Sequence, residues 1–231
     1  MDITARASSI GALADETRRA LYEHVVSQPD AVTREAAATA LSVPAHMARF
    51  HLDKLVEAGL LETEFRRLSG RTGPGAGRPS KLYRRAGGTV SISLPERRYD
   101  LVGHVLASAI ERAGSGMPLR DALAEVAHEE GRSIAASAPA DSSTDDDESA
   151  RLTAVLTAHG YEPRSRSDEG GDAVILANCP FDSLARDHTA LICSANLSLL
   201  GGVIDGLGCT HLSAHGEPHT GRCCVAIRPR P

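Results

Sequence analysis

The chain has no tryptophan, only three phenylalanines and four tyrosines, and a formal net charge of −5 at pH 7. Its hydrophobic cores must therefore be built mainly from alanine, leucine, valine and isoleucine. The negative charge argues against coating of nucleic acid by the whole surface, so any such contact must come from a local basic patch. No run of about 18 apolar residues stands out, and we expect no membrane-spanning segment.

Cysteine is missing from the first three quarters of the chain, since all five cysteines follow position 178. The beginning of the chain lacks the basic and apolar regions of a secretory signal peptide, so we expect a cytoplasmic protein whose thiols stay reduced. An odd number of cysteines also fits poorly with a disulfide framework. Thiolates are soft ligands for zinc and iron–sulfur clusters, which makes metal ligation the first hypothesis and unconnected buried cysteines the alternative.

The first sixty residues carry the periodicity and the caps of three helices. Apolar residues recur at helical spacing over 9–26, which predicts one amphipathic helix. Thr33 is a suitable N-cap for a short helix over 34–41. Ser42 is a suitable N-cap for a third helix, which is expected to run to about Ala58.

Two short helices joined by a tight turn are typical of a helix-turn-helix that reads the major groove of DNA. On the second of them, His46, Arg49 and Phe50 share the outward face and are expected to face the bases. Residues 60–66 then alternate as a strand does, and residues 81–85 form a second strand after a loop rich in glycine, proline and arginine. This hairpin is the expected wing of a winged helix.

The expected wing is strongly basic, with no acidic residue between Phe65 and Arg85. In an acidic chain, such a local concentration of positive charge is the footprint expected for contacts with DNA phosphates. A solvated basic loop is the alternative interpretation. The residues expected to hold phosphates are Arg66, Arg67, Arg71, Arg78 and Lys81.

Three segments of this region resemble winged-helix regulators of the ArsR/DeoR type. They are Leu13–Arg19, His51–Leu61 and Gly77–Arg84, of which the last is the most specific. The resemblance implies that the partner is a double-stranded DNA operator.

Two further helices are expected over 94–113 and 118–136. Each of them either pairs with its twin in a dimer or packs within one subunit. A homodimer is expected in any case, because a single winged helix makes few base contacts and paired half-sites multiply them. Residues 137–149 are small, polar and acidic, which predicts a solvated linker.

The last eighty residues predict a small α+β domain with a sheet of about three strands. The expected elements are a helix over 152–159, a strand over 172–178, a helix over 191–207, and strands over 209–215 and 223–228. Cys223 and Cys224 point to opposite sides of the last strand, so only one of them readily enters a single site. We expect this to be Cys223, which leaves Cys224 as a bystander or a redox partner.

The cysteines of this domain are widely spaced, without the C-x-x-C knuckle of a zinc ribbon. Wide spacing still permits a site, because strand ends and a helix can bring distant thiols together. The frames around the cysteines are Asn178-Cys179-Pro180-Phe181, Leu191-Ile192-Cys193 and Gly221-Arg222-Cys223-Cys224-Val225.

Together with the N-terminal segments, these frames resemble SufR-type regulators over nearly the whole chain. The resemblance implies a dimeric repressor of iron–sulfur assembly genes that carries a cluster, with Cys179, Cys193 and Cys223 as ligands. Cys209 is the chemically natural fourth ligand, and a histidine, a carboxylate or an open iron site are the alternatives. Asp182 is a departure, since many relatives have histidine at this position.

Two competing functions stay open at the level of the sequence. Cys209, His211 and His215 alternate onto one face of an expected strand, and such a set suits zinc or nickel. A polar exposed strand face is the plainer interpretation. An enzyme is the other alternative, but no Ser/His/Asp frame, phosphate loop or pair of carboxylates supports it, so we expect a regulator.

These observations predict an α+β protein that binds DNA under the control of a metal centre. The expected centre is an iron–sulfur cluster, of the four-iron, four-sulfur kind, with zinc as the alternative. The expected parts are a winged helix-turn-helix over 1–90, connecting and dimerisation helices over 91–140, an acidic linker over 141–150, and a cysteine-containing sensor domain over 151–231.

Overall fold

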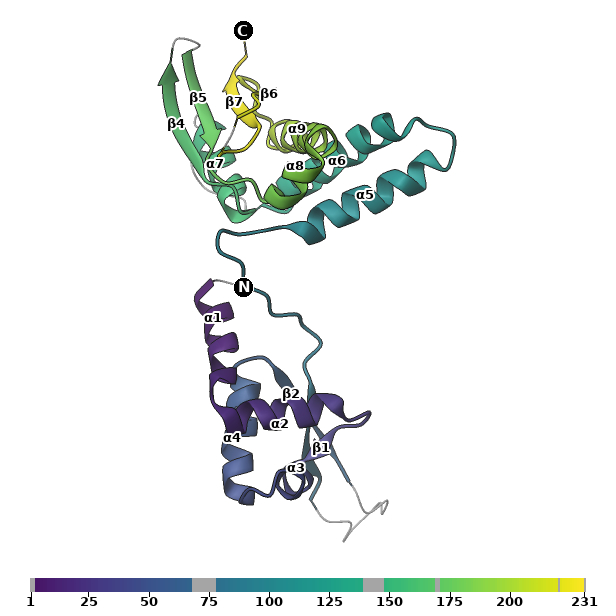
Figure 1. Cartoon of the computed structure of the whole chain (residues 1–231), viewed down its shortest axis with the longest axis vertical. Helices are drawn as coiled ribbons and strands as arrows, with labels where there is room; N and C mark the ends of the chain where they lie inside the picture. The colour runs from purple at the N-terminus through teal and green to yellow at the C-terminus, as the bar shows by residue number, and fades with distance from the viewer. Residues whose placement is uncertain (1–2, 68–77, 139–147, 169–170, 220, 231) are drawn as a thin grey trace. The chain divides into compact units, whose positions relative to one another are not determined.

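The computed structural model describes residues 3–67, 78–138, 148–168, 171–219 and 221–230. The chain divides into two compact units, Met1–Ile92 and Ser93–Pro231 (Figure 1). Each unit has its own hydrophobic core of mostly aliphatic side chains. The expected mixture of helices and strands is confirmed.

The first unit is a group of helices next to a small antiparallel sheet of strand order β1-β3-β2. Its elements are α1 (Ile3–Gly11), the short 3-10 helix η1 (Ala12–Ala14), α2 (Glu16–Ser27), β1 (Val32–Thr33), α3 (Arg34–Ala40), α4 (Ala45–Glu57), β2 (Leu61–Arg66) and β3 (Ser80–Arg85). The hairpin of β2 and β3 pairs Leu61 with Arg85 and Arg66 with Ser80. Side chains from α2, α3, α4 and the sheet close the core, so the expected winged helix-turn-helix arrangement is present.

Two expectations about the helix starts are wrong. The single helix expected over 9–26 is two α-helices, because the Asp15 carboxylate accepts a hydrogen bond from the backbone N–H of Arg18 and caps a new helix there. Ser42 does not cap α4, since it lies in the preceding turn with a φ of 54°. The helix begins after Pro44, which has no side chain that could cap it. Thr33 caps α3 as expected, accepting from the N–H of Ala36.

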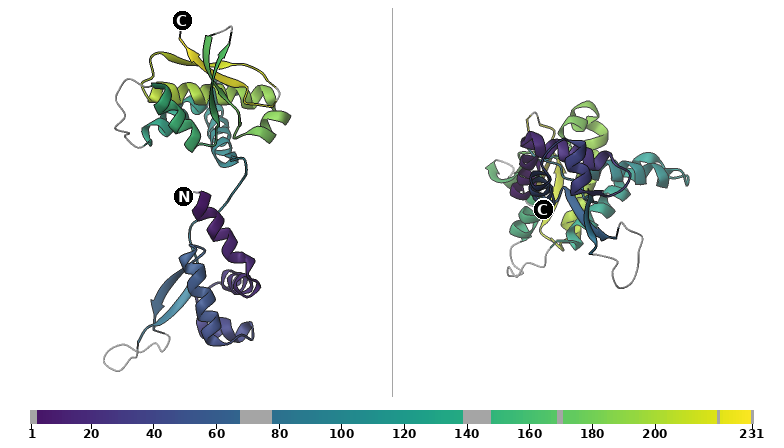
Figure 2. Two further views of the ribbon diagram at one scale, coloured as in Figure 1. Left: turned by 90° about the vertical axis from the view of Figure 1, so that its left-hand side faces the viewer. Right: turned by 90° about the horizontal axis from the view of Figure 1, so that it is seen from below.

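In the second unit, helices lie against one four-stranded antiparallel sheet of order β4-β5-β7-β6 (Figure 2). Its elements are α5 (Tyr99–Ala113), α6 (Leu119–Ala136), α7 (Glu148–Ala158), β4 (Pro163–Asp168), β5 (Gly171–Leu176), α8 (Asp182–Asp187), α9 (Thr189–Gly206), β6 (Leu212–Gly216) and β7 (Val225–Pro229). The sequence predicted about three strands and missed β4. That strand is polar and largely exposed at the sheet edge, so it lacks the apolar alternation that marks a strand.

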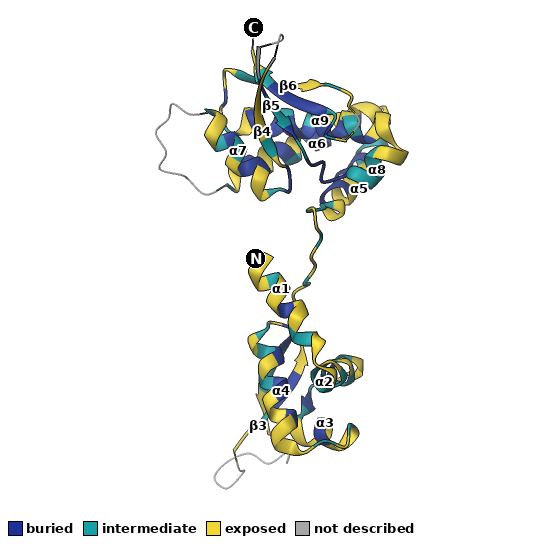
Figure 3. Cartoon of the chain, turned by 60° about the vertical axis from the view of Figure 1, so that its left-hand side comes forward, coloured by how far each residue is buried: buried dark blue, intermediate teal, exposed yellow. Residues whose placement is uncertain are grey.

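The central element of the second unit is α9, which packs against α6 on one side and against β6 and β7 on the other. Most of its large apolar side chains are buried in the interior, while Leu191 near its start is exposed (Figure 3). By length and composition alone α9 could span a membrane, contrary to the expectation from the sequence. A core helix passes the same test, and the packing of α9 within this unit accounts for its apolar composition.

Glycines let α6 and α9 approach closely. A Cβ added to Gly202 would lie 2.0 Å from the carbonyl oxygen of His128, and one added to Gly131 would lie 2.0 Å from that of Leu199. Real Cβ atoms do not approach backbone atoms so closely, so only glycine fits at either position.

The helices expected to connect the two parts of the chain, α5 and α6, contribute buried side chains to the core of the second unit and so belong to that unit.

Candidate functional site

The outward face of α4 carries the side chains that the sequence assigned to base contacts. His46, Arg49 and Phe50 are all exposed, and Phe50 has 55% of its surface accessible. On the opposite face, Ala48, Leu52 and Leu55 are fully buried in the core of the unit. The helix is therefore held by its apolar side and presents a cation and two rings to solvent.

A cleft of about 430 Å³ between α4 and the wing collects positive charge. Its basic lining residues are Arg34, Arg49, Arg78 and Lys81. Arg34, on α3, was not singled out by the sequence, because it lies outside both the expected recognition helix and the expected wing. Glu35 and Asp53 also line the cleft and pair with Arg34 and Lys81, so the four cations outnumber two carboxylates. This surplus of positive charge makes the surface attractive to an anionic backbone such as that of DNA.

Asp53 ties the outward face of α4 to the wing. Its Oδ1 accepts hydrogen bonds from Lys81 Nζ at 2.6 Å and from the Tyr83 hydroxyl at 2.9 Å, and its Oδ2 lies 3.6 Å from Arg49 Nε. Partial burial opposes ionisation, but the hydrogen bonds from Lys81 and Tyr83 dominate and lower the pKa of Asp53. The ionised carboxylate therefore sets the position of Lys81 and restrains Arg49.

The other basic residues of the wing differ in their surroundings. Arg66 is exposed and lies 3.6 Å from Glu64 on the same strand, while Arg67 and Arg78 are exposed beyond the paired part of the hairpin. Arg71 lies outside the described residues. The stretch from Phe65 to Arg85 contains no acidic residue, but Glu64 directly precedes it on β2 and lies beside Arg66.

In the second unit, four of the five cysteines line one cavity of about 1040 Å³. Cys179 follows β5, Cys193 lies on α9, and Cys223 and Cys224 come directly before β7. Three of these cysteines are the ligands implied by the resemblance. The structure thus brings together thiols that are up to 45 residues apart in the sequence.

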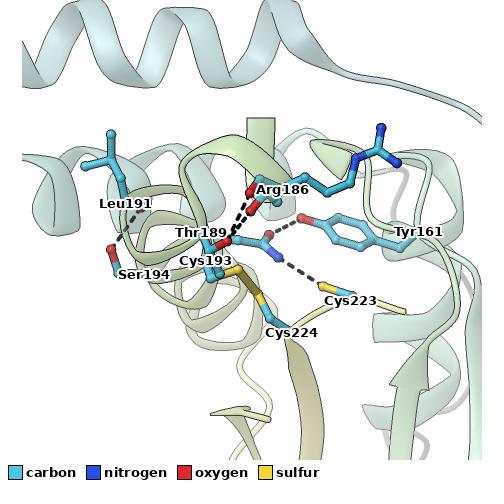
Figure 4. Close-up of a disulfide and its surroundings, with 10 residues drawn as sticks. Tyr161, Arg186, Thr189, Leu191, Cys193, Ser194, Cys223 and Cys224 are labelled. Carbon is cyan, nitrogen blue, oxygen red and sulfur yellow. Dashed lines mark hydrogen bonds between the residues drawn. A yellow bond between two sulfur atoms is a disulfide. The ribbon is translucent and has the colours of Figure 1, made fainter. Parts of the chain in front are cut away.

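Cys193 and Cys224 form a disulfide across this cavity, with their Cα atoms 6.2 Å apart (Figure 4). Cys224 was expected to be a bystander or a redox partner, and here it is bonded to Cys193, one of the implied ligands. The expectation that the thiols stay reduced, without a disulfide, is therefore wrong for this pair. The geometric reason for this bond is local: β7 begins at Val225, so the two neighbouring cysteines are not held on opposite faces of a strand. Both of them reach the cavity.

The remaining pair, Cys179 and Cys223, carries free thiols that hydrogen-bond to each other. This hydrogen bond outweighs burial and lowers the pKa of Cys179. The same neighbour, together with burial, raises the pKa of Cys223. Cys179 is therefore the more acidic of the two thiols, and the thiolate is the form that binds metals.

A buried hydrogen-bond chain orients Cys223. The Tyr161 hydroxyl donates to Asn196 Oδ1 at 2.5 Å, and Asn196 Nδ2 donates to Cys223 Sγ at 3.2 Å. Both Tyr161 and Asn196 are almost completely buried. Burial raises the pKa of Tyr161 well above its ordinary value, so the hydroxyl keeps the proton that it donates. An amide N–H directed at a cysteine sulfur is typical of the outer shell of a thiolate site.

Cys209, the expected fourth ligand, lies elsewhere. It is buried, its thiol lies 3.9 Å from the backbone oxygen of Glu148, and burial raises its pKa. It is not among the residues that line the cysteine cavity. The strand expected from 209 begins at Leu212, so the alternation that placed Cys209 beside His211 and His215 does not occur. Among the described residues, no group of three histidine, cysteine or acidic side chains is arranged to hold a metal ion.

The comparisons with known proteins concern the first unit. Residues 13–64 match a family model described as a helix-turn-helix domain. No curated protein and no solved structure matches the chain. The match covers α2 to β2 and includes the exposed face of α4.

The fold of the first unit, its basic cleft and this match identify a helix-turn-helix domain in that unit. The chain carries a DNA-binding domain of the kind found in transcriptional regulators, which points to a regulator rather than to an enzyme. A protein of this class acts where the DNA is, in the cytoplasm or the nucleoid.

Proposed function

We propose that this protein is a cytoplasmic, homodimeric SufR-type repressor whose affinity for its operator is controlled by an iron–sulfur cluster in the second unit. The observation that carries the proposal is the gathering of Cys179, Cys193, Cys223 and Cys224 along one cavity. The helix-turn-helix supplies the other half of the argument. A bound cluster would provide a centre whose integrity or oxidation state depends on oxygen, on peroxide or on the availability of iron.

The cysteines of the cavity are the residue type that such a group uses, since thiolates are its usual ligands, although as they lie in this structure the described residues do not form a group of three that could hold a metal ion. Cys179 and Cys223 are free thiols, and Cys193 becomes a donor when its disulfide takes two electrons and two protons from a thiol reductant. The fourth donor can come from within the cavity, where Cys224 and Asp182 also lie. The same thiolates would also suit zinc, and a measurement of the metal content distinguishes zinc from an iron–sulfur cluster.

The turn that carries Cys179 is bound to the first residues of the second unit, just after the DNA-binding unit ends. Arg97 Nη1 donates to Asn178 Oδ1 at 2.5 Å and to the Cys179 carbonyl at 3.1 Å. Asn178 Nδ2 donates to the Glu96 carbonyl, and the N–H of Arg98 donates to the Pro180 carbonyl. A change at Cys179 therefore acts directly on residues 96–98.

This contact gives a route for regulation. A ligand shifts DNA affinity only through different interactions with the binding and the non-binding state. Ligation of Cys179 fixes the 178–180 turn and, with it, the start of the second unit. Loss of the ligand releases the turn and allows the connection to the DNA-binding unit to rearrange.

Arg97→Ala tests this route. The substitution removes the hydrogen bonds from the guanidinium to Asn178 and Cys179 but leaves the thiols in place. We expect iron content to stay near that of the wild type, while a coupling of about tenfold or more between cluster and DNA affinity falls toward none. Arg98→Ala is the matched control, because the Arg98 side chain pairs with Asp100 instead. Equal coupling in Arg97→Ala and Arg98→Ala would rule out this route.

The DNA surface makes a separate prediction. Arg49→Ala, on the outward face of α4, should weaken binding to the preferred operator by about 1–3 kcal/mol and relax sequence preference. Arg78→Ala, on the wing, should weaken binding to every sequence alike and lower the salt dependence. Both can be measured by titrating operator and scrambled duplexes at several salt concentrations. A sequence-selective loss in Arg78→Ala would contradict its assignment to phosphates.

The proposed function is tested by measuring the DNA affinity of one preparation before and after its iron is removed. An operator is first selected from random duplexes, where we expect two half-sites about 10 base pairs apart for a homodimer. Anaerobic protein with its iron should bind this duplex at least about tenfold more tightly than the same protein after chelation. Equal affinity in the two states would refute control by the cluster.

A further inference from the structure

The cysteine cavity contains a buried arginine with unused hydrogen-bond donors. Arg222 lines the cavity directly before Cys223, and only 11% of its side chain is exposed. Its Nη2 lies 3.3 Å from Glu217 Oε2. Its Nε and Nη1 are buried, and neither has a hydrogen-bond partner among the described residues. A buried donor that is left unpaired costs about 1–3 kcal/mol, and more on a charged group.

The other arginines of the cavity differ in this respect. Arg97 Nη1 donates to Asn178 and Cys179, and Arg97 Nη2 lies 3.7 Å from Asp182. Arg186 is largely exposed and lies 3.2 Å from the same carboxylate. The N–H groups of both arginines are therefore hydrogen-bonded by the protein or by solvent. Arg222 alone among these three combines burial with free N–H groups.

The carboxylate partner of Arg222 also pairs with a second arginine. Glu217 is its ionic partner, but Arg228 shares that carboxylate at the shorter distance of 2.6 Å. The hydrogen bond from Arg228, followed by that from Arg222, lowers the pKa of Glu217. Arg222 therefore has only a share of the Glu217 carboxylate, while its Nε and Nη1 are without a hydrogen-bond partner among the described residues.

We propose that Arg222 donates hydrogen bonds from Nε and Nη1 to the anionic iron–sulfur group held by the neighbouring cysteines. This inference rests on the proposed function and assigns a binding residue to the same cavity. Sulfide and thiolate sulfurs of such a group accept hydrogen bonds, and the Nε–H and Nη1–H bonds of the planar guanidinium point in different directions, so each would meet its own sulfur. Hydrogen bonds and positive charge near the sulfurs stabilise the reduced form, so Arg222 raises the reduction potential.

The experiment compares Arg222→Gln with Arg186→Gln, since both substitutions remove one positive charge from the same cavity. Each protein is purified without oxygen, and the midpoint potential and the rate of iron loss to a ferrous chelator are measured. We expect Arg222→Gln to lower the reduction equilibrium constant about tenfold, which is 59 mV for a one-electron couple. Iron loss should become about tenfold faster. Arg186→Gln should leave both quantities as in the wild type.

Arg222→Lys covers the case in which the glutamine variant does not fold. Lysine keeps the charge but loses the Nε–H and Nη1–H donors in their fixed plane, so a smaller shift in the same direction is expected. A folded Arg222→Gln protein without iron, beside an iron-loaded Arg186→Gln protein, also supports the assignment. Potentials and iron-loss rates that are equal in the Arg222 variants and in Arg186→Gln would overturn it. An iron-free wild type would instead refute the proposed function itself.

Discussion

Replacing Gly202 by alanine is expected to destabilise the second unit by about 3 kcal/mol or more, at the upper end of the usual cost of overpacking. The added Cβ would lie 2.0 Å from the oxygen and 2.8 Å from the carbon of the His128 carbonyl. These are backbone atoms of α6, so no side-chain rotation can relieve the contact. Helices α6 and α9 would have to separate in the middle of the core that they share.

The neighbouring glycine supplies the control. A Cβ at Gly201 would meet its nearest neighbour, the His128 ring, at 3.9 Å, which is an ordinary contact. Because alanine favours a helix by about 1 kcal/mol over glycine, Gly201→Ala should be neutral or stabilising. Thermal unfolding followed by circular dichroism should separate the two variants by on the order of 10 °C. Equal melting temperatures would show that α6 and α9 do not cross as described.

Cys179→Ala is expected to remove essentially all the iron that the protein binds. Cys179 is the thiol with the lowered pKa, and its carbonyl carries the contact with Arg97. Metal ligation requires the thiolate, so alanine at this position removes the first ligand to form. The measurement is iron and acid-labile sulfide per protein chain after anaerobic purification.

Cys209→Ala is the matched variant, since it removes an equally buried sulfur that lies outside the cavity. Its iron content should equal that of the wild type, because alanine replaces a thiol that serves as a small apolar group. If Cys209→Ala loses iron to the same extent as Cys179→Ala, the cluster does not lie in the cavity assigned to it. Retention of iron by Cys179→Ala would lead to the same conclusion.

The DNA-binding unit was largely predictable from the sequence because its signals are local. Thr33 caps α3, and the paired strands of the wing lie within one residue of their expected ends. The prediction failed where a local signal was ambiguous. Apolar spacing continued through Asp15, which hid the break that its carboxylate caps.

The cysteine cavity could be predicted only in part. The three cysteines implied as ligands do line one cavity. The fourth cysteine of the cavity is Cys224, whereas the sequence analysis had chosen Cys209. That choice assumed strands beginning at 209 and 223, whereas β6 and β7 begin at Leu212 and Val225. Side chains alternate only within a strand, so residues just before it are placed by the turn and by the packing of α9. Arg222 gave no signal at all, because its burial depends on contacts distant in the sequence.

The central claim is that the cavity of the second unit holds an iron–sulfur cluster in a DNA-binding protein. It is tested most directly by purifying the wild type without oxygen and measuring iron, acid-labile sulfide and visible absorption together. We predict a brown protein with matched iron and sulfide and a broad band near about 400 nm. A colourless protein, whether it contains zinc or no metal, would contradict the account.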